Sequence, residues 1–446
     1  MAQRASSRPR LIQAMIDAFS LPDLRKRLLI TFGILVAFRF LVHVPVPGVD
    51  AEVMKDQLNN NPLFGMFNMF SGGALNNFSV AAMGVYPYIT ASIVMTLMTP
   101  VIPALQRLAE EGESGRNRIN TITHWLMIPL AGLSGYAQLM LLRGQGALLD
   151  TDPLSTVAIV MSLIAGTMLL VWLGEQITQY GIGNGVSIII FAGIMAQLPE
   201  QIGKGFFDVQ QGERAWVGLV VFLVITLVTA FLVVIFTEAH RRVPVQYAKS
   251  VYRGGRMYRQ SGSSYIPMRV NTAGMIPLIF AMAVVTFPGI IATWAGGTTD
   301  SGGFAGWVVN VFSANAHLPG GLIYWGVYFL LVVGFAFFYT TVMFQQQDLP
   351  GVLQRQGGFV PGIRPGKQTS VYLNSVIMHI TWAGALFLAL VAIIPFLAQT
   401  VASATMLQVS LQVSSTGMLI VVGVVLDTMK QMEAQLAMRR YEGFIK

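Results

Sequence analysis

Ten apolar runs, each close to the length of a membrane-crossing helix, limit what this chain can fold into. A spanning helix needs about 20 mostly apolar residues. The runs occupy 28–47, 82–99, 121–142, 154–178, 183–203, 215–238, 271–295, 320–344, 374–397 and 406–429. Only 11% of the 446 residues are charged, whereas soluble domains carry about 25%. The sequence therefore predicts an all-α polytopic membrane protein with ten transmembrane helices.

The basic residues predict how these helices are oriented. Of the 28 Lys and Arg residues, 23 fall in the termini and alternate loops on one side, four fall on the other side, and Arg39 lies inside the first run. Positive charge concentrates on the cytoplasmic side of membrane proteins. We therefore expect both termini, 1–27 and 430–446, and the long loops 239–270 and 345–373 to be cytoplasmic.

One apolar segment is too short to cross. Residues 63–78 contain Phe64, Phe67 and Phe70, and then Ser71-Gly72-Gly73 breaks the run. Non-spanning backbone at membrane depth is tolerated only where it is buried in protein or lines a watery cavity. The segment predicts a re-entrant or interfacial piece beside a cavity.

Ten spans divide into two halves of five, 28–203 and 204–429. An odd number of spans turns the second half upside down relative to the first, which is the inverted-repeat plan. Gly84–Ile89 and Gly274–Ile279 both read G-x-x-P-x-I, each in the second span of its half. We therefore expect two inverted five-helix halves, although glycine and proline are common enough in membrane helices to allow chance.

Catalytic patterns are weak. The sequence holds no H-E-x-x-H, Walker or G-x-G-x-x-G motif and no cysteine. Gly132-Leu133-Ser134-Gly135 resembles the nucleophile of intramembrane serine proteases, which would also need a histidine base such as His43 or His379. Small residues that let helices pack closely explain the motif better. We expect no enzymatic activity, cofactor or metal.

Ionisable residues within the runs lie near the predicted ends, where long side chains can reach the interface. Arg39, Glu175, Asp427 and three histidines are of this kind. A secondary transporter of a small solute, the alternative function, usually needs a buried carboxylate or polar site at mid-membrane. The centres of the spans carry almost no ionisable residues, which favours an apolar seal that excludes water by dewetting.

The loop 239–270 is more basic than topology requires. It contains seven Lys and Arg residues, with four tyrosines interleaved. Topogenic charge and contact with anionic lipids would explain part of this excess. A docking surface for RNA phosphate or an acidic protein explains it better.

Several motifs, in order along nearly the whole chain, resemble the bacterial SecY family of protein-conducting channel subunits. They are Pro45–Asp50, Phe67–Gly73, Gly84–Ser92, Glu111–Arg116, Gly174–Thr178 with Gly181–Gly185, Arg241-Arg242 with Gln246–Ala248, and Phe359–Gly366.

The resemblance implies an hourglass of two inverted halves around a central pore. A re-entrant plug helix, about 64–76, would block the outer funnel, with the motif Phe67, Asn68, Met69, Phe70, Ser71, Gly72 and Gly73. The implied pore ring is Val85, Ile89, Val186, Ile190, Ile279 and Ile420. Val85 and Ile89, like Val186 and Ile190, are i, i+4 pairs that share a helix face. Valine replaces the family's usual isoleucine at two ring positions.

The resemblance also implies a lateral gate, docking sites and partners. The candidate gate residues are Thr90, Ser92, Thr96, Asn271 and Thr272, although local bonds to the preceding helical turn are an equal explanation. The candidate docking residues for the ATPase SecA and the ribosome are Arg241, Arg242, Arg256 and Arg364. The other implied partners are SecE, SecG, signal sequences, nascent polypeptides and anionic lipids, at the bacterial cytoplasmic membrane.

Overall fold

The computed structural model describes residues 21–48, 68, 71–144, 152–211, 215–253, 256–274, 276–294, 303–312, 320–347, 349–404 and 415–442. The chain divides into two compact units: Met1–Phe207 with Ile420–Lys446, and Asp208–Leu419. The predicted halves 28–203 and 204–429 assign the last span differently, and they stay a prediction.

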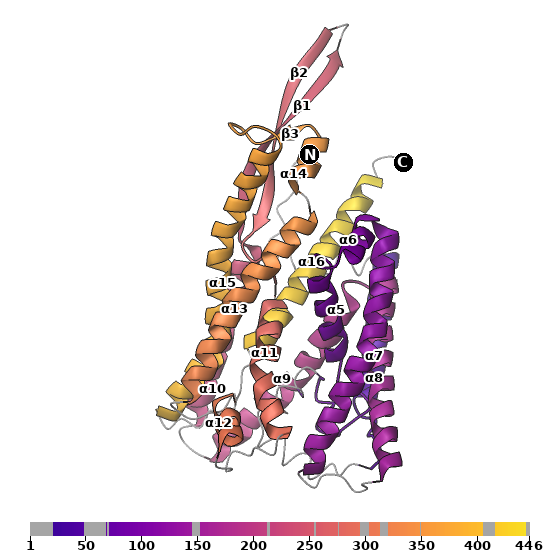
Figure 1. Cartoon of the computed structure of the whole chain (residues 1–446), viewed down its shortest axis with the longest axis vertical. Coiled ribbons are helices and arrows are strands. Elements are labelled where there is room, and N and C mark those ends of the chain that lie inside the picture. Colours follow the sequence, from indigo (N-terminus) through magenta and orange to yellow (C-terminus); the bar gives the residue numbers. More distant parts are fainter. Residues whose placement is uncertain are drawn as a thin grey trace. The chain divides into compact units, whose positions relative to one another are not determined.

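The first unit is helical. It comprises α2 (Pro22–Leu41), α5 (Tyr86–Met98), α6 (Pro103–Glu110), α7 (Glu113–Gly144), α8 (Pro153–Tyr180), most of α9 (Gly185–Gln211) and most of α16 (Ser415–Glu442). Proline stands in the first turn of α2, α5, α6 and α8, where its missing N–H breaks no helical hydrogen bond. Helices α7 and α8 run side by side (Figure 1), and α5 packs against α7.

A chain of turns, Ser71–Val85, links the predicted plug to α5. Its side chains Leu75, Phe78 and Met83 join the core with Leu139 of α7 and Leu163 of α8. The same segment pairs with the end of the first span, since the amide of Val46 donates to the Phe78 carbonyl at 3.0 Å and that of Val80 to the Val44 carbonyl at 3.0 Å. Irregular backbone is thus held inside the unit by burial and hydrogen bonds.

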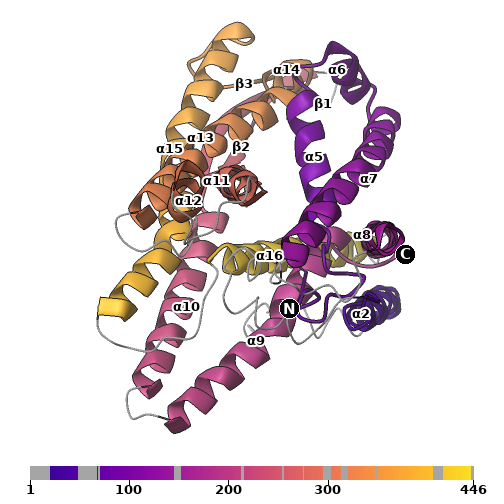
Figure 2. The same cartoon turned by 60° about the horizontal axis from the view of Figure 1, so that its bottom comes forward.

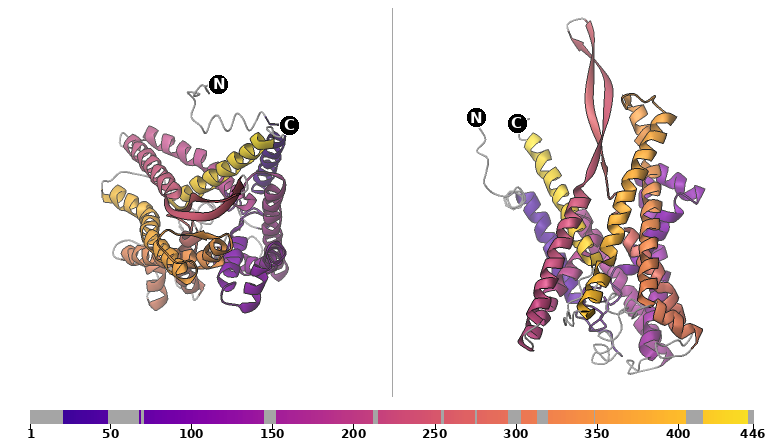
Figure 3. Two further views of the ribbon diagram at one scale, coloured as in Figure 1. Left: turned by 90° about the horizontal axis from the view of Figure 1, so that it is seen from above. Right: turned by 90° about the vertical axis from the view of Figure 1, so that its left-hand side faces the viewer.

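The second unit carries helices and a small sheet. Its elements are α10 (Ala215–Glu238), β1 (His240–Arg253), β2 (Arg256–Arg269), α11 (Ile276–Trp294), α12 (Phe304–Val311), α13 (Gly320–Gln347), α14 (Leu349–Arg355), β3 (Gly358–Phe359) and α15 (Lys367–Ala404). The strand order is β2-β1-β3, with both pairs antiparallel. Figure 3 shows the twisted β1–β2 hairpin extending past the end of α15.

The sheet is built from the loops 239–270 and 345–373, which we call the two basic loops. Val243 and Val245 alternate with exposed Arg242 and Pro244 on β1, the period expected of a strand with one buried face. The two valines pack with Phe344, Leu353 and other residues of α13, α14 and α15. This core fixes the base of the hairpin to the helices.

The fold class predicted from sequence is confirmed at the level of a mostly helical protein with several apolar helices. Each of the ten predicted spans overlaps one helix. Among the described residues, three helical stretches are long and apolar enough to cross a bilayer: Pro153–Tyr180, Gly321–Arg355 and Lys367–Ile394. Helices α5 and α6, bent by 97° (Figure 2), would add a fourth if they form one span. The full count of ten stays a prediction.

The repeated G-x-x-P-x-I motif adopts the same local structure in both units. Gly84 and Gly274 have φ of 57° and 63°, a conformation that glycine adopts without strain. Each glycine lies two residues before the first residue of a helix, and Pro87 and Pro277 lie in the first turns of α5 and α11. This local equivalence supports an internal repeat.

Candidate functional site

The end of the predicted plug is a hydrogen-bonded turn. Asn68 is helical, and Ser71–Asn76 form successive turns. The Asn68 carbonyl accepts from the Gly73 amide at 2.9 Å and from the Ser71 hydroxyl at 3.0 Å. The Asn68 side chain makes two hydrogen bonds with Asn76. Its Nδ2 donates to Oδ1 of Asn76 at 2.9 Å, and its Oδ1 accepts from the Asn76 backbone amide at 3.2 Å. Phe67, Met69 and Phe70 lie outside the described residues.

Two other helices bind this turn through long-range hydrogen bonds. Arg39 of α2 donates from Nη1 to the Gly72 carbonyl at 2.8 Å. Gln197 of α9 donates from Nε2 to the Asn68 carbonyl at 2.7 Å. Hydrogen bonds from a charged donor are roughly twice as strong as neutral ones, so Arg39 is the stronger of the two tethers.

A contact between two glycines sets the turn against α9. A Cβ added at Gly72 would lie 2.7 Å from the Gly193 Cα and 3.3 Å from Phe38 Cζ. Gly72 also has a φ of 71°, so no other residue suits this position without strain. The backbones of the turn and α9 therefore touch directly. We name Arg39, Gly193 and Gln197 the turn anchors.

Sequence reasoning missed the turn anchors. It placed Arg39 among residues that reach the membrane interface, whereas the structure binds its guanidinium to Gly72. A cation inside an apolar run was the available signal, because such residues are rare and usually have a partner. Gly193 and Gln197 carry no comparable signal in an apolar helix.

The predicted pore ring is largely buried. Val85, Ile190 and Ile420 in the first unit and Ile279 in the second are buried, and Ile89 and Val186 are half-buried. Val186 packs on Gly174 of α8, where an added Cβ would lie 3.1 Å from its Cγ2. Ile279 belongs to a different unit from the other five residues, and the ring stays a prediction.

Three of the predicted gate residues donate their hydroxyl to a backbone carbonyl three or four residues earlier. Thr90 donates to the Tyr86 carbonyl at 3.1 Å, and Thr96 to the Ser92 carbonyl at 2.8 Å. Thr272 donates to the Arg269 carbonyl at 3.0 Å. Asn271 is 8% exposed. These local bonds match the structural explanation weighed in the sequence analysis, and the gate assignment stays a prediction.

The predicted docking arginines lie on or beside the sheet. Arg241 and Arg242 are exposed on β1, and the Arg242 guanidinium sits 4.8 Å from the centre of the Tyr265 ring on β2, within the range of a cation–π interaction. Arg256 begins β2, and exposed Arg364 follows β3.

Pairing of β1 with β3 is what brings the two basic loops together. Gln246 pairs with Phe359 and Tyr247 with Gly358. The sequence predicts no contact between the loops, because nothing in either loop signals a strand partner more than 100 residues away. Their joint surface is a finding of the structure, and its docking role stays a prediction.

Comparisons with known proteins agree on one family. The SecY family model matches residues 79–429. The Protein translocase subunit SecY of Streptomyces scabiei is 40% identical over 456 residues, covering 98% of this chain and 100% of its own. That of Halalkalibacterium halodurans is 41% identical over 446 residues, with 98% and 100% covered.

Solved structures share the fold. One described as a protein conducting channel has a TM-score of 0.63 at 16% identity and covers 94% of this chain and 96% of its own. Sec61 from a canine ribosome-channel complex has a TM-score of 0.62 at 17% identity, with the same coverage. With the family model matching most of its length and relatives at 40% identity matching almost all of it, the chain belongs to the SecY family.

Proposed function

We propose that this protein is the channel-forming subunit through which unfolded secretory polypeptides cross the bacterial cytoplasmic membrane and membrane helices leave sideways into lipid. The observation that carries the proposal is the 40% identity to protein translocase subunits over 98% of the chain. The tethered re-entrant turn supports it independently, because a polar turn held by an intramembrane arginine suits a removable closure.

In this mechanism two layers keep the resting channel closed. The plug, 64–76, fills the outer funnel, and the turn anchors hold its end. The ring of Val85, Ile89, Val186, Ile190, Ile279 and Ile420 forms a dry constriction. Ions would have to lose their hydration to cross it. Aliphatic side chains offer a passing polypeptide no strong specific bond, so chains of any sequence can slide through.

The remaining predicted sites serve entry and exit. Thr90, Ser92, Thr96, Asn271 and Thr272 would line the lateral gate, where small polar groups tolerate both exposure and closure. Arg241, Arg242, Arg256 and Arg364 would bind SecA and the ribosome at the cytoplasmic side. SecE, SecG and anionic lipids complete the assembly. The energy for transport would come from these partners, and the chain itself would catalyse no reaction.

Deleting residues 64–76 tests the channel against the transporter. In a channel the deletion removes the outer closure, and we expect the ion conductance of vesicles containing the full chain to rise by about tenfold or more, since only the apolar ring remains to exclude ions. A transporter's coupling site would lie elsewhere. Unchanged conductance, with unchanged yield of folded protein, would contradict the proposal.

Ser134→Ala is the control for the protease alternative. The variant leaves a channel's transport intact and abolishes a serine protease. Nδ1 of His43 lies 2.8 Å from the Arg39 carbonyl and Nδ1 of His379 lies 2.6 Å from the Ser375 carbonyl, which leaves Nε2 of each ring as the nitrogen that a protease would use. The activity of the variant therefore decides between the two functions.

A further inference from the structure

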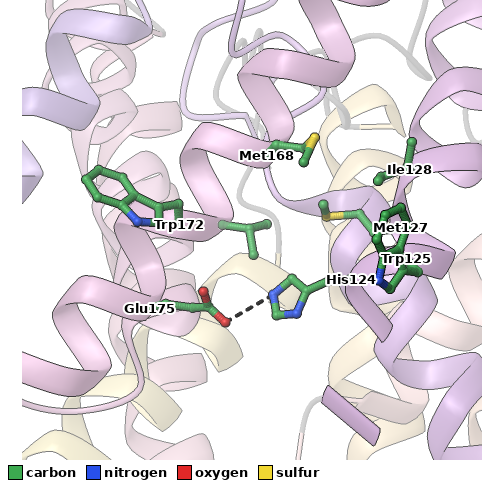
Figure 4. Close-up of a pocket in the computed structure, with 8 residues that line it drawn as sticks. His124, Trp125, Met127, Ile128, Met168, Trp172 and Glu175 are labelled. Carbon is green, nitrogen blue, oxygen red and sulfur yellow. Dashed lines mark ion pairs between the residues drawn. The ribbon is translucent and has the colours of Figure 1, made fainter. Parts of the chain in front are cut away.

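An open cleft runs between α7 and α8 in the first unit (Figure 4). Trp125 and Met127 of α7 and Met168 and Trp172 of α8 form its apolar walls. One end is polar, where His124 and Glu175 face each other across the cleft. None of these side chains belongs to the predicted plug, ring, gate or docking surface.

A hydrogen-bond network fixes the polar end. Nε2 of His124 lies 3.1 Å from Oε1 of Glu175, an ion pair when the imidazole is protonated. Asn120 donates from Nδ2 to the same oxygen at 3.5 Å. The Tyr88 hydroxyl of α5 donates to Oδ1 of Asn120 at 3.4 Å. Even so, the Glu175 side chain is 43% exposed, which leaves the carboxylate open to a ligand.

The position of the cleft along the helices matches the edge of a bilayer. Trp125 lies four residues into the predicted span 121–142, and Trp172 six residues before the end of the span 154–178. At 1.5 Å per residue these positions are roughly 6–9 Å below the span ends. Trp125 is 71% and Trp172 53% exposed, and tryptophan is enriched at membrane–water interfaces. The polar end thus reaches head-group depth, and the apolar walls reach acyl-chain depth.

We propose that the cleft binds a phospholipid whose head group is zwitterionic and carries a primary ammonium, as ethanolamine phospholipids do. The carboxylate of Glu175 would accept hydrogen bonds from the ammonium. The negative charge of the carboxylate complements the positive charge of the ammonium. A choline head group has no N–H to donate. A phosphatidylglycerol head group is anionic, lacks an ammonium and would be repelled by Glu175.

The inference is separate from the proposed function. It requires membrane insertion of α7 and α8, but it does not require the plug, the ring or any transported polypeptide. Its readout is bound lipid. Failure of the channel experiments would therefore leave this test unaffected, and the reverse also holds.

The test compares lipids retained by the full chain. The chain is purified from vesicles with equal amounts of ethanolamine and choline phospholipids that have identical acyl chains, and lipids still bound are counted by native mass spectrometry. We expect the ethanolamine lipid to exceed the choline lipid by about five- to tenfold, the ratio typical of one charge-assisted hydrogen bond. Glu175→Gln removes the charge at the same size and should lower the ratio to about one.

Two further variants sharpen the result. Glu110→Gln on α6, an exposed acid that does not line the cleft, is the matched control and should keep the wild-type ratio. Met168→Trp fills the apolar walls and should lower retention of both lipids. Equal retention by the wild-type chain, or a preference that survives Glu175→Gln, would overturn the proposal. Stronger retention of phosphatidylglycerol in a third arm, or a bound polypeptide instead of lipid, would also overturn it.

Discussion

Gly193→Val is expected to open an ion leak through the resting protein. A Cβ at Gly193 would already lie 3.0 Å from the Cα of Gly72 and 3.2 Å from its backbone nitrogen. Valine adds two methyl groups in this space, and backbone cannot yield as a flexible side chain does. The turn must therefore move off α9, which also strains the hydrogen bonds from Arg39 and Gln197.

The expected leak is about tenfold above wild type in the conductance of vesicles, because the displaced turn carries the plug with it and leaves the ring as the remaining barrier. Gly203→Val is the matched control, since Gly203 lies on the same helix and an added Cβ there meets nothing within 4 Å. Equal conductance in the two variants would show that contact of the turn with α9 does not control closure. Arg39→Leu removes the charged tether without adding bulk, and it should also raise the conductance of vesicles above wild type.

Gly166→Ala is expected to destabilise the first unit. Gly166 lies on α8, and an added methyl would overlap the carbonyl of Val80. The carbonyl belongs to the buried turns that pack against α8, so the methyl must separate the two backbones. Overpacking of this kind reduces stability by about 1–3 kcal/mol. In a thermal scan in detergent, the temperature at which the folded, monodisperse chain is lost should fall by on the order of 5 °C.

Gly132→Ala serves as the control for this effect. Gly132 lies on the neighbouring helix α7, and its added methyl would make an ordinary contact of 3.5 Å with Ile164 Cδ1. Alanine is the better helix former, so this variant should be unchanged or more stable by about 0.5–1 kcal/mol. A wild-type melting temperature for Gly166→Ala would contradict the tight packing of Val80 on α8.

Local patterns in the sequence predict the helices well and the contacts between them poorly. Every apolar run overlaps a helix, because a run of this length and composition has few other stable structures in lipid. The apolar run 63–78 is too short to cross, and its described part, Ser71–Phe78, accordingly forms turns rather than a spanning helix. By contrast, the bond from Arg39 to Gly72 joins residues 33 positions apart, and no periodicity encodes such a pair.

The basic loops show a signal that was present but unused. The alternation of Val243, Val245 and Tyr247 with Arg242, Pro244 and Gln246 has the period of a strand. The interleaved arginines and tyrosines also indicate a binding surface, and 239–270 is predicted as a cytoplasmic loop rather than a hairpin. The pairing of β1 with β3 is different, because Gly358 and Phe359 form a strand of two residues, too short for any pattern to predict.

The polar cluster of the cleft, Asn120, His124 and Glu175, can be predicted from the sequence only in part. From the sequence, Glu175 near the end of an apolar run is expected to reach the membrane interface. Its partners Asn120 and His124 are on another helix, so only the packing of α7 on α8 identifies them.

A disulfide between position 279 and a translocating chain tests the central claim most directly. The protein contains no cysteine, so Ile279→Cys introduces a single thiol at the proposed ring. A secretory polypeptide with one mid-segment cysteine is trapped halfway across, and cross-links are scored. We predict a cross-link that appears only with the trapped polypeptide. Val284→Cys, on the same helix and 45% exposed, is the control. Strong cross-links from Val284→Cys and none from Ile279→Cys would contradict a polypeptide path through the ring.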